Sequence, residues 1–146
     1  MFGRRGFNDL WGIYHMYLDV DFADKEPNAS SQYCLLYHVH KFSDSYGVLD
    51  VMGHEVGHSF HRSEVNYRYR HESGAIAEHI ADMFGHFLGA WSLLDPDWLI
   101  GEDIEGDDST YIRNMAYPSR DHVSDYVWSP GDEDHDYGGV HDKSTI

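Results

Sequence analysis

The hydrophobic pattern predicts a helix over residues 50–62. Apolar side chains recur there at every fourth position, at Met52, Val56 and Phe60. Histidines recur at the same interval on the opposite side of this helix, at His54 and His58. The segment therefore has an apolar back and an imidazole front. Gly53 and Gly57 each cost roughly 1 kcal/mol of helix stability relative to alanine, which is easier to understand if another backbone must come close.

A second helix is predicted over residues 74–92, and its two sides differ. One side is broad and apolar, with Ile76, Ile80, Met83, Phe84, Phe87 and Trp91. Glu78 and Asp82 lie roughly opposite that side. The neighbours of these carboxylates are small: Gly74, Ala81, Gly85 and Gly89. Because small residues permit a close approach between helices, we expect the carboxylate side to be buried as well as the apolar side.

The rest of the chain has weaker patterns. Residues 8–22 have apolar positions at helical spacing, so we expect a helix there. Residues 23–31, ADKEPNASS, are expected to form a loop, and residues 33–42, YCLLYHVHKF, a strand. From Asp95 onward, proline, glycine and acidic residues favour mostly loop with short helical turns. No repeat is present, and the length suits one α+β domain.

Composition narrows the classes of partner. The chain has 26 acidic and 10 basic residues, a formal net charge of −16, so its surface repels nucleic-acid phosphates and anionic lipids. Such a surface suits divalent cations, cationic substrates or a salty medium. The sequence has no run of eighteen apolar residues, and its first ten lack the apolar core of a signal peptide. Its single cysteine, Cys34, excludes an internal disulfide.

The sequence His54-Glu55-Val56-Gly57-His58 is typical of a metal site. His54 and His58 are one helical turn apart and can bind one ion. Zinc favours imidazole nitrogen and keeps an open catalytic position when three protein ligands hold it. Glu55 projects about 100° from His54, where a general base for a metal-bound water would stand. The alternative is a surface histidine pair, because this motif occurs often by chance.

The second helix offers the third ligand. Two carboxylates on a buried side need compensation, and a metal ion with its histidine ligands supplies it. Glu78 then completes the zinc site, and Asp82 accepts the second ring N–H of a ligating histidine. The alternative is an acidic stripe that faces solvent. The small residues beside the two carboxylates argue against that alternative.

Together these segments resemble the thermolysin family of neutral zinc metallopeptidases. HEVGH is followed after nineteen residues by Glu78 in ESGAIAEHIADMFG. PDWLIGEDI, YIRNMAYP and DYGGVH then come in the family's order and at nearly its spacing. The resemblance covers residues 42–141 well and residues 8–41 loosely. It implies a zincin-like core, in which the HExxH helix packs on a second helix that carries the third ligand, with a small strand region and a long irregular C-terminal segment.

The resemblance also implies roles for individual residues. His54, His58 and Glu78 match the zinc ligands, Glu55 the general base and Asp82 the carboxylate beside a ligand. Tyr69 and His141 match the residues that stabilise the tetrahedral intermediate, and Asp136 the carboxylate that orients this histidine. Arg113 matches an arginine that binds the substrate carbonyl beyond the cleaved bond. The positions that line the family's apolar pocket for the next residue are Phe42, Val51 and Ile112.

Two features depart from the family pattern. Asp50, Asp97 and Glu102 match calcium ligands, but Gly89 and Leu99 stand where further carboxylates are expected. Three carboxylates could still hold one calcium ion at reduced affinity. The family's edge strand that binds substrate backbone has no clear counterpart; by spacing, residues 24–27 fall there.

The resulting expectation is a zinc endopeptidase that acts on peptides or proteins, prefers an apolar residue after the cleaved bond and, by resemblance, is secreted. Because the family continues past GGVH into a helical domain, we expect residues 1–146 to form one truncated zincin-like catalytic domain. A second copy or a completing chain would then finish the cleft. One alternative is a zinc-binding protein of this fold with little or no peptidase activity. Another is an acidic, calcium- or salt-adapted binding module in which HEVGH is fortuitous.

Overall fold

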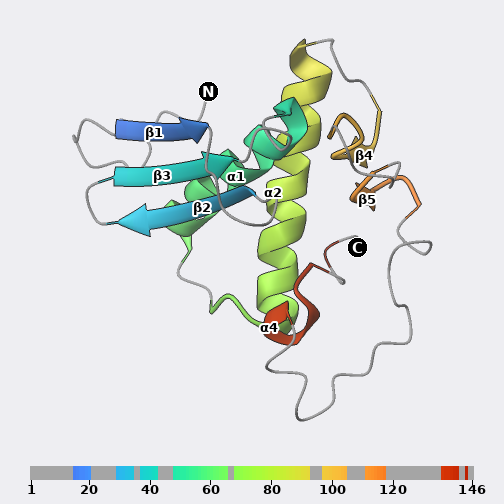
Figure 1. Ribbon diagram of the computed structural model, residues 1–146. Helices are drawn as coiled ribbons and strands as arrows, with labels where there is room; N and C mark the ends of the chain where they lie inside the picture. The colour runs from blue at the N-terminus through green and yellow to red at the C-terminus, as the bar shows by residue number, and fades with distance from the viewer. Residues whose placement is uncertain are drawn as a thin grey trace.

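The computed structural model describes residues 15–20, 29–34, 37–42, 48–65, 68–92, 97–104, 111–117, 136–141 and 144; within the strands before residue 43 it describes backbone alone, apart from Ala29. Its elements, in chain order, are β1 (His15–Val20), β2 (Ala29–Cys34), β3 (Tyr37–Phe42), α1 (Leu49–Glu64), α2 (His71–Ser92), β4 (Leu99–Ile100), β5 (Arg113–Asn114) and α4 (Asp136–Gly139). Figure 1 shows the three N-terminal strands on one side of α1 and the long helix α2 beyond them.

The N-terminal sheet has the strand order β1-β3-β2, with β1 parallel and β2 antiparallel to β3. The helix predicted over residues 8–22 is therefore wrong for His15–Val20, which form β1. HMYLDV also alternates, with apolar side chains at every second position, and pairing with β3 selects this period over the helical one. Residues 8–14 and 21–22 lie outside the described residues.

The boundaries between strand and loop before α1 also differ from the predicted ones. The strand predicted over residues 33–42 is confirmed for Tyr37–Phe42, whereas residues 33–34 belong to β2. The loop predicted over residues 23–31 is wrong for residues 29–31, which begin β2. Alanine and serine have low strand propensity, and here the ladder with β3 supplies the stabilisation that the side chains do not.

Both predicted central helices are confirmed, and they pack through small residues. A Cβ atom built on Gly53 would lie 2.8 Å from the Cα atom of Gly85. One built on Gly57 would lie 2.8 Å from the Cα atom of Ala81. Any side chain at these glycines would push the helices apart, so the glycines that weaken α1 permit its contact with α2. The other side of α1 packs against β2 and β3.

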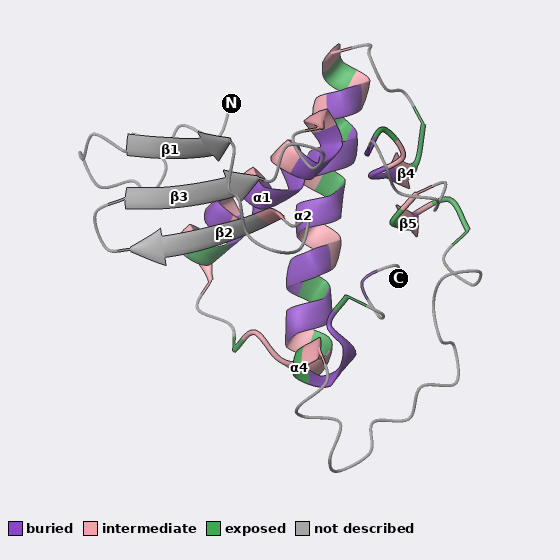
Figure 2. Ribbon diagram, viewed as in Figure 1, coloured by how far each residue is buried: buried purple, intermediate pink, exposed green. Residues whose placement is uncertain are grey.

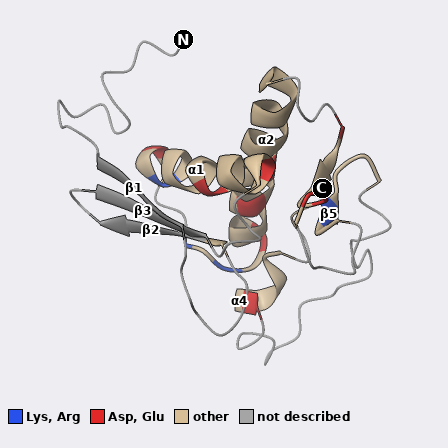
Figure 3. Cartoon of the chain, turned by 45° about the horizontal axis from the view of Figure 1, so that its top comes forward, with Lys and Arg blue, Asp and Glu red and all other residues tan. Residues whose placement is uncertain are grey.

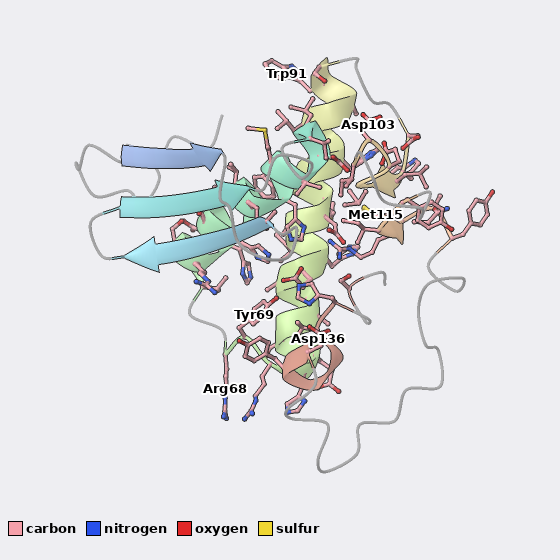
Figure 4. The ribbon with its side chains drawn as sticks, viewed as in Figure 1. Arg68, Tyr69, Trp91, Asp103, Met115 and Asp136 are labelled. Carbon is pink, nitrogen blue, oxygen red and sulfur yellow. The ribbon has the colours of Figure 1, made fainter. Side chains whose placement is uncertain are left out.

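On α2, the side with small residues is more buried than the side with large apolar residues. The predicted burial of the small-residue side is confirmed: Gly74, Ala81, Gly85 and Gly89 are all buried. The predicted burial of the apolar side is wrong for four of its six residues, with exposed fractions of 41% for Ile76, 36% for Met83, 55% for Phe87 and 83% for Trp91. Ile80 and Phe84 are half-buried, and the ring of Phe84 lies 5.1 Å from that of Phe60 on α1. Figure 2 shows buried and exposed positions alternating along α2, and Figure 4 shows Trp91 projecting from its end.

The segment after α2 contains a short ladder that the sequence analysis missed. Leu99 pairs with Asn114 and Ile100 with Arg113, so β4 and β5 form a two-stranded antiparallel sheet. Strands of two residues are too short to show a period, which is why a loop was expected. No helix in the described residues combines the length and the hydrophobicity that a membrane span requires.

The apolar core of the described part of the chain is small. Val51 and Ile104 form one cluster, against which Val48 and Met52 pack. Among the described residues, seven apolar side chains are buried, against ten polar or charged ones. Buried polar groups need partners, and most of these lie where α1 meets α2. The interior of the described part therefore contains polar and charged groups as well as apolar side chains.

Candidate metal centre

The contact between α1 and α2 brings three metal-ligating side chains together. His54 and His58 project from α1, one turn apart, toward Glu78 of α2. The Nε2 atom of His54 lies 3.3 Å from Oε2 of Glu78, and that of His58 lies 3.1 Å from Oε1. One ligand atom from each residue lies within 4.8 Å of the others. Figure 3 shows acidic residues on the neighbouring parts of the two helices.

A buried carboxylate fixes the first histidine. The Nδ1 atom of His54 lies 2.7 Å from Oδ1 of Asp82. Arg113 donates to both oxygens of Asp82, from Nε at 2.7 Å and from Nη2 at 2.6 Å. Burial alone raises the pKa of Asp82, but Arg113 and His54 outweigh it and lower the pKa to about 2. An ionised Asp82 accepts the Nδ1 proton of His54, so Nε2 is the ring nitrogen directed at the ligand cluster.

The charges of this centre favour a cation. Burial lowers the pKa of His54, yet hydrogen bonds to Asp82 and Glu78 raise it to about 10. Burial raises the pKa of Glu78, yet hydrogen bonds from His54 and His58 bring it below its usual range. Burial lowers the pKa of His58. The two carboxylates thus favour positive charge on His54, although burial disfavours it on His58, and a divalent ion would satisfy the same carboxylates.

The donor set fits zinc. Two imidazole nitrogens and one carboxylate leave an open fourth position in tetrahedral coordination. Glu78 is fully buried, and its Oε2 atom lies 3.3 Å from Nε2 of both His54 and His141 but makes no hydrogen bond of good geometry to any described residue. An unsatisfied buried oxygen costs about 1–3 kcal/mol or more. A metal ion bound by His54, His58 and Glu78 would remove that cost.

Glu55 stands beside the ligands without a partner of its own. Its side chain is 5% exposed, and its Oε2 atom is buried without a hydrogen bond to any described residue. Burial raises the pKa of Glu55 to about 7, although His54 opposes the shift. A carboxyl group that titrates near neutral pH can both accept and release a proton there.

Segments remote in sequence bring two hydrogen-bond donors to the same place. The hydroxyl group of Tyr69 donates to Oε1 of Glu78 and lies 3.4 Å from Nε2 of His141. Asp136 binds His141 twice, at 2.8 Å from the backbone nitrogen and 2.5 Å from Nδ1. Burial raises the pKa of Tyr69, so the phenol keeps its proton. Figure 4 shows Tyr69 and Asp136 near the same end of α2.

The structure describes the side chains of only two of the three residues of the predicted substrate pocket. Val51 is 5% exposed and packs against Ile104 in the apolar cluster. Ile112 is 36% exposed and lies against Gly101. The side chain of Phe42 lies outside the described residues. The pocket therefore stays a prediction.

The predicted calcium ligands do not converge. In the described part of the chain, the zinc-ligand cluster is the one group of three such side chains with ligand atoms within 4.8 Å. Asp50 accepts hydrogen bonds from the backbone nitrogens of Val51 and Gly101, so it ties the start of α1 to the segment after β4. Asp97 accepts one from Leu99 at 2.8 Å. The structure thus gives backbone partners to two of the three carboxylates, Asp50 and Asp97, and does not assemble them with Glu102.

The sequence analysis did not single out Tyr137, which borders the site. Its ring centre lies 5.6 Å from that of Tyr69, edge to face, and it is 60% exposed. Its backbone has φ 49° and ψ 30°, the left-handed region, at a cost of roughly 1–2 kcal/mol for a residue with a side chain. The aromatic pair with Tyr69 stabilises the fold by about 0.5–1.5 kcal/mol, which does not exceed the cost of the strained backbone. Stability therefore does not account for a tyrosine at this position. No hydrophobic period marks this position, because it lies in a turn.

Comparisons with known proteins point to one family. The family model described as "Thermolysin metallopeptidase, alpha-helical domain" matches residues 65–146. Bacillolysin of Bacillus cereus is 36% identical over 107 residues, which are 72% of this chain and 19% of that protein. The extracellular elastase of Staphylococcus epidermidis is 35% identical over 111 residues, 72% of this chain and 20% of that protein.

A solved structure shares the fold. The precursor of protealysin, a metalloproteinase from Serratia proteamaculans, superposes with a TM-score of 0.75 and 24% identity, over 99% of this chain and 50% of that one. The α+β, zincin-like fold is thereby confirmed. The chain spans about a fifth of the length of the two relatives named above. The family model matches residues 65–146, and one truncated domain over residues 1–146 stays a prediction. Since that match covers more than half of the sequence, the chain belongs to the thermolysin family of metallopeptidases, whose membership implies zinc.

Proposed function

We propose that this chain is the catalytic core of a zinc-dependent endopeptidase. The observation that carries the proposal is the convergence of His54, His58 and Glu78 within 4.8 Å, beside a Glu55 carboxylate oxygen that has no hydrogen-bond partner among the described residues. Membership of a metallopeptidase family supports it. We also propose that the protein acts outside the cell, a location that the name of the staphylococcal relative gives for that protein.

The ligands have separate tasks in this proposal. When bound, zinc supplies a Lewis acid for the peptide carbonyl and for the attacking water. His54 and His58 present Nε2 to it, and Glu78 presents a carboxylate oxygen. Asp82 holds the proton on Nδ1 of His54, and Arg113 keeps Asp82 ionised and in place. Replacing either partner would let the imidazole turn or change tautomer.

Glu55 moves the proton. It accepts a proton from water as the water oxygen forms a bond to the carbonyl carbon. When the carbon–nitrogen bond of the tetrahedral intermediate breaks, Glu55 returns that proton to the leaving amine. Its pKa of about 7 suits both transfers. General acid–base catalysis of this kind contributes about 10²–10⁴-fold to a rate.

Tyr69 and His141 stabilise the negative charge on the tetrahedral oxygen. Their donor atoms are 3.4 Å apart, so both can reach one oxygen. Asp136 accepts the Nδ1 proton of His141 and so holds the ring with Nε2 on the side of Tyr69. Loss of one such donor costs about 10²–10³ in kcat.

Arg113 also serves the substrate in this proposal, because a guanidinium has more donors than Asp82 uses. It would bind the carbonyl of the residue after the cleaved bond. Phe42, Val51 and Ile112 would form the pocket for that residue, with an apolar preference.

The second candidate function is zinc binding by the same fold with little or no peptidase activity. The two relatives are matched over about a fifth of their length, so their activity is a proposal for this chain. One experiment distinguishes the two candidates: zinc content and hydrolysis of casein and a furylacryloyl dipeptide, measured on the same sample with and without a chelator.

The endopeptidase proposal expects chelator-sensitive hydrolysis by the wild type. It expects Glu55→Gln to retain zinc and lose at least about 100-fold in kcat/KM. Hydrolysis by zinc-loaded Glu55→Gln at the wild-type rate would overturn the mechanism. Stoichiometric zinc without turnover in the wild type would select the second candidate.

A further inference from the structure

Tyr137 occupies a turn built to place side chains at the metal centre. Asp136, Tyr137, Gly138 and Gly139 are consecutive residues with positive φ, at 47°, 49°, 90° and 75°. The turn directs the Asp136 carboxylate at His141 and the Tyr137 ring at Tyr69. Gly138 is required there, because a Cβ atom would collide with the ring of His71. No comparable steric contact requires a tyrosine at position 137, and a glycine there would adopt the same backbone conformation with less strain.

An aromatic row runs from the ligands to the surface through Tyr137. The ring of His58 lies 6.2 Å from that of Tyr69, which lies 5.6 Å from that of Tyr137. Tyr69 is partly buried, whereas Tyr137 is 60% exposed. The outer ring is thus available to a molecule that approaches Tyr69 and His141. A strained, exposed aromatic residue beside a reaction centre is a feature that function explains better than packing.

The direction of a bound peptide follows from the two ends of the site. Arg113 lies on the His54 side, through Asp82, and is assigned to the carbonyl after the cleaved bond. Tyr69 lies on the His58 side and, together with His141 at 3.4 Å, is assigned to the oxygen of the cleaved carbonyl. Since Tyr137 packs on Tyr69 and is exposed, it is the side chain beside which the residue that carries this carbonyl would lie.

We propose that Tyr137 determines specificity for the residue before the cleaved bond. Its ring forms, with the edge of Tyr69, an apolar wall that favours a large apolar or aromatic side chain there. The inference rests on the proposed peptidase function and adds to it a second preference, on the opposite side of the bond from the predicted apolar pocket.

Two peptides that differ only in this residue test the proposal. One has phenylalanine before the cleaved bond, the other alanine, and both have leucine after it. Tyr137→Gly should reduce kcat/KM about 10-fold for the phenylalanine peptide and less than about 2-fold for the alanine peptide, as expected for one lost apolar contact. Tyr137→Phe, which keeps the ring, should retain the wild-type preference. Zinc content and Tm should not fall in either variant.

Equal losses on both peptides, or no loss on either, would overturn the proposal. If the wild type cleaves neither peptide, the peptidase function fails separately. Calorimetric titration of both peptides into zinc-loaded Glu55→Gln protein then tests the contact alone. Preferential binding of the phenylalanine peptide that disappears in Glu55→Gln/Tyr137→Gly supports the proposal, and equal binding of the two peptides overturns it.

Discussion

The two sides of α2 differ in a way that hydrophobicity does not predict. The side with glycine and alanine packs against α1 and contains the fully buried carboxylates of Glu78 and Asp82. The opposite side contains the large apolar residues, of which Phe87 and Trp91 are more than half exposed. Figure 2 shows the contrast along the helix. On this helix, close backbone approach and charge partners determine which side is buried.

The difference explains where stability should be sensitive. Each buried carboxylate depends on named partners, and each glycine at the contact depends on the absence of a side chain. The exposed apolar side has few contacts to lose in the described part of the chain. Substitutions on the two sides should therefore have very different costs.

The largest expected effect is on the buried charge network. Asp82→Ala removes the acceptor of both hydrogen bonds from Arg113 and of the one from His54. Because a buried guanidinium is left uncompensated, the free energy of unfolding should fall by about 3–5 kcal/mol. Urea denaturation measures this loss. Exposed Asp103→Ala is the matched control, with an expected change within about 0.5 kcal/mol. Similar values for the two variants would contradict the account.

The next effect is on the helix contact. Gly57→Val places side-chain atoms against Ala81 and Phe84. Overpacking of this kind costs typically about 1–3 kcal/mol, more than the roughly 1 kcal/mol or less gained in helix propensity. Thermal unfolding should show a lower Tm. A zinc titration should show a reduced affinity, because the two helices carry different ligands. An unchanged Tm would mean that the helices do not approach as closely as described.

The smallest effect is expected on the apolar side. Phe87→Ser and Trp91→Ser should each change the free energy of unfolding by no more than about 0.5 kcal/mol, because these side chains are 55% and 83% exposed. Chemical denaturation of both variants beside the wild type measures this. A loss well above 1 kcal/mol in either would show that this side is covered in solution.

Much of the site could be predicted from sequence, because helical geometry is local. Spacing alone placed His54 and His58 on one side of α1, and the small residues around Glu78 and Asp82 correctly indicated a buried side. Tyr69, His141 and Arg113 came from the family resemblance, since no local pattern relates residues so distant in the chain.

The errors have physical causes. Residues 15–20 fit both a helical and an alternating period, and only pairing with β3 decides between them. The exposure of Phe87 and Trp91 depends on tertiary packing, which the pattern along one helix cannot show. The position of Tyr137 depends on a left-handed turn. Side-chain hydrophobicity has no bearing on such a turn.

The account rests centrally on zinc held between α1 and α2. Elemental analysis of the purified chain and of Glu78→Ala, after equilibration with zinc and removal of the excess, tests it most directly. The account predicts one zinc per wild-type chain and, for Glu78→Ala, an affinity at least about 10-fold lower, since one of three protein ligands is lost. A wild-type chain without zinc, or a Glu78→Ala chain that holds it equally well, would contradict the account.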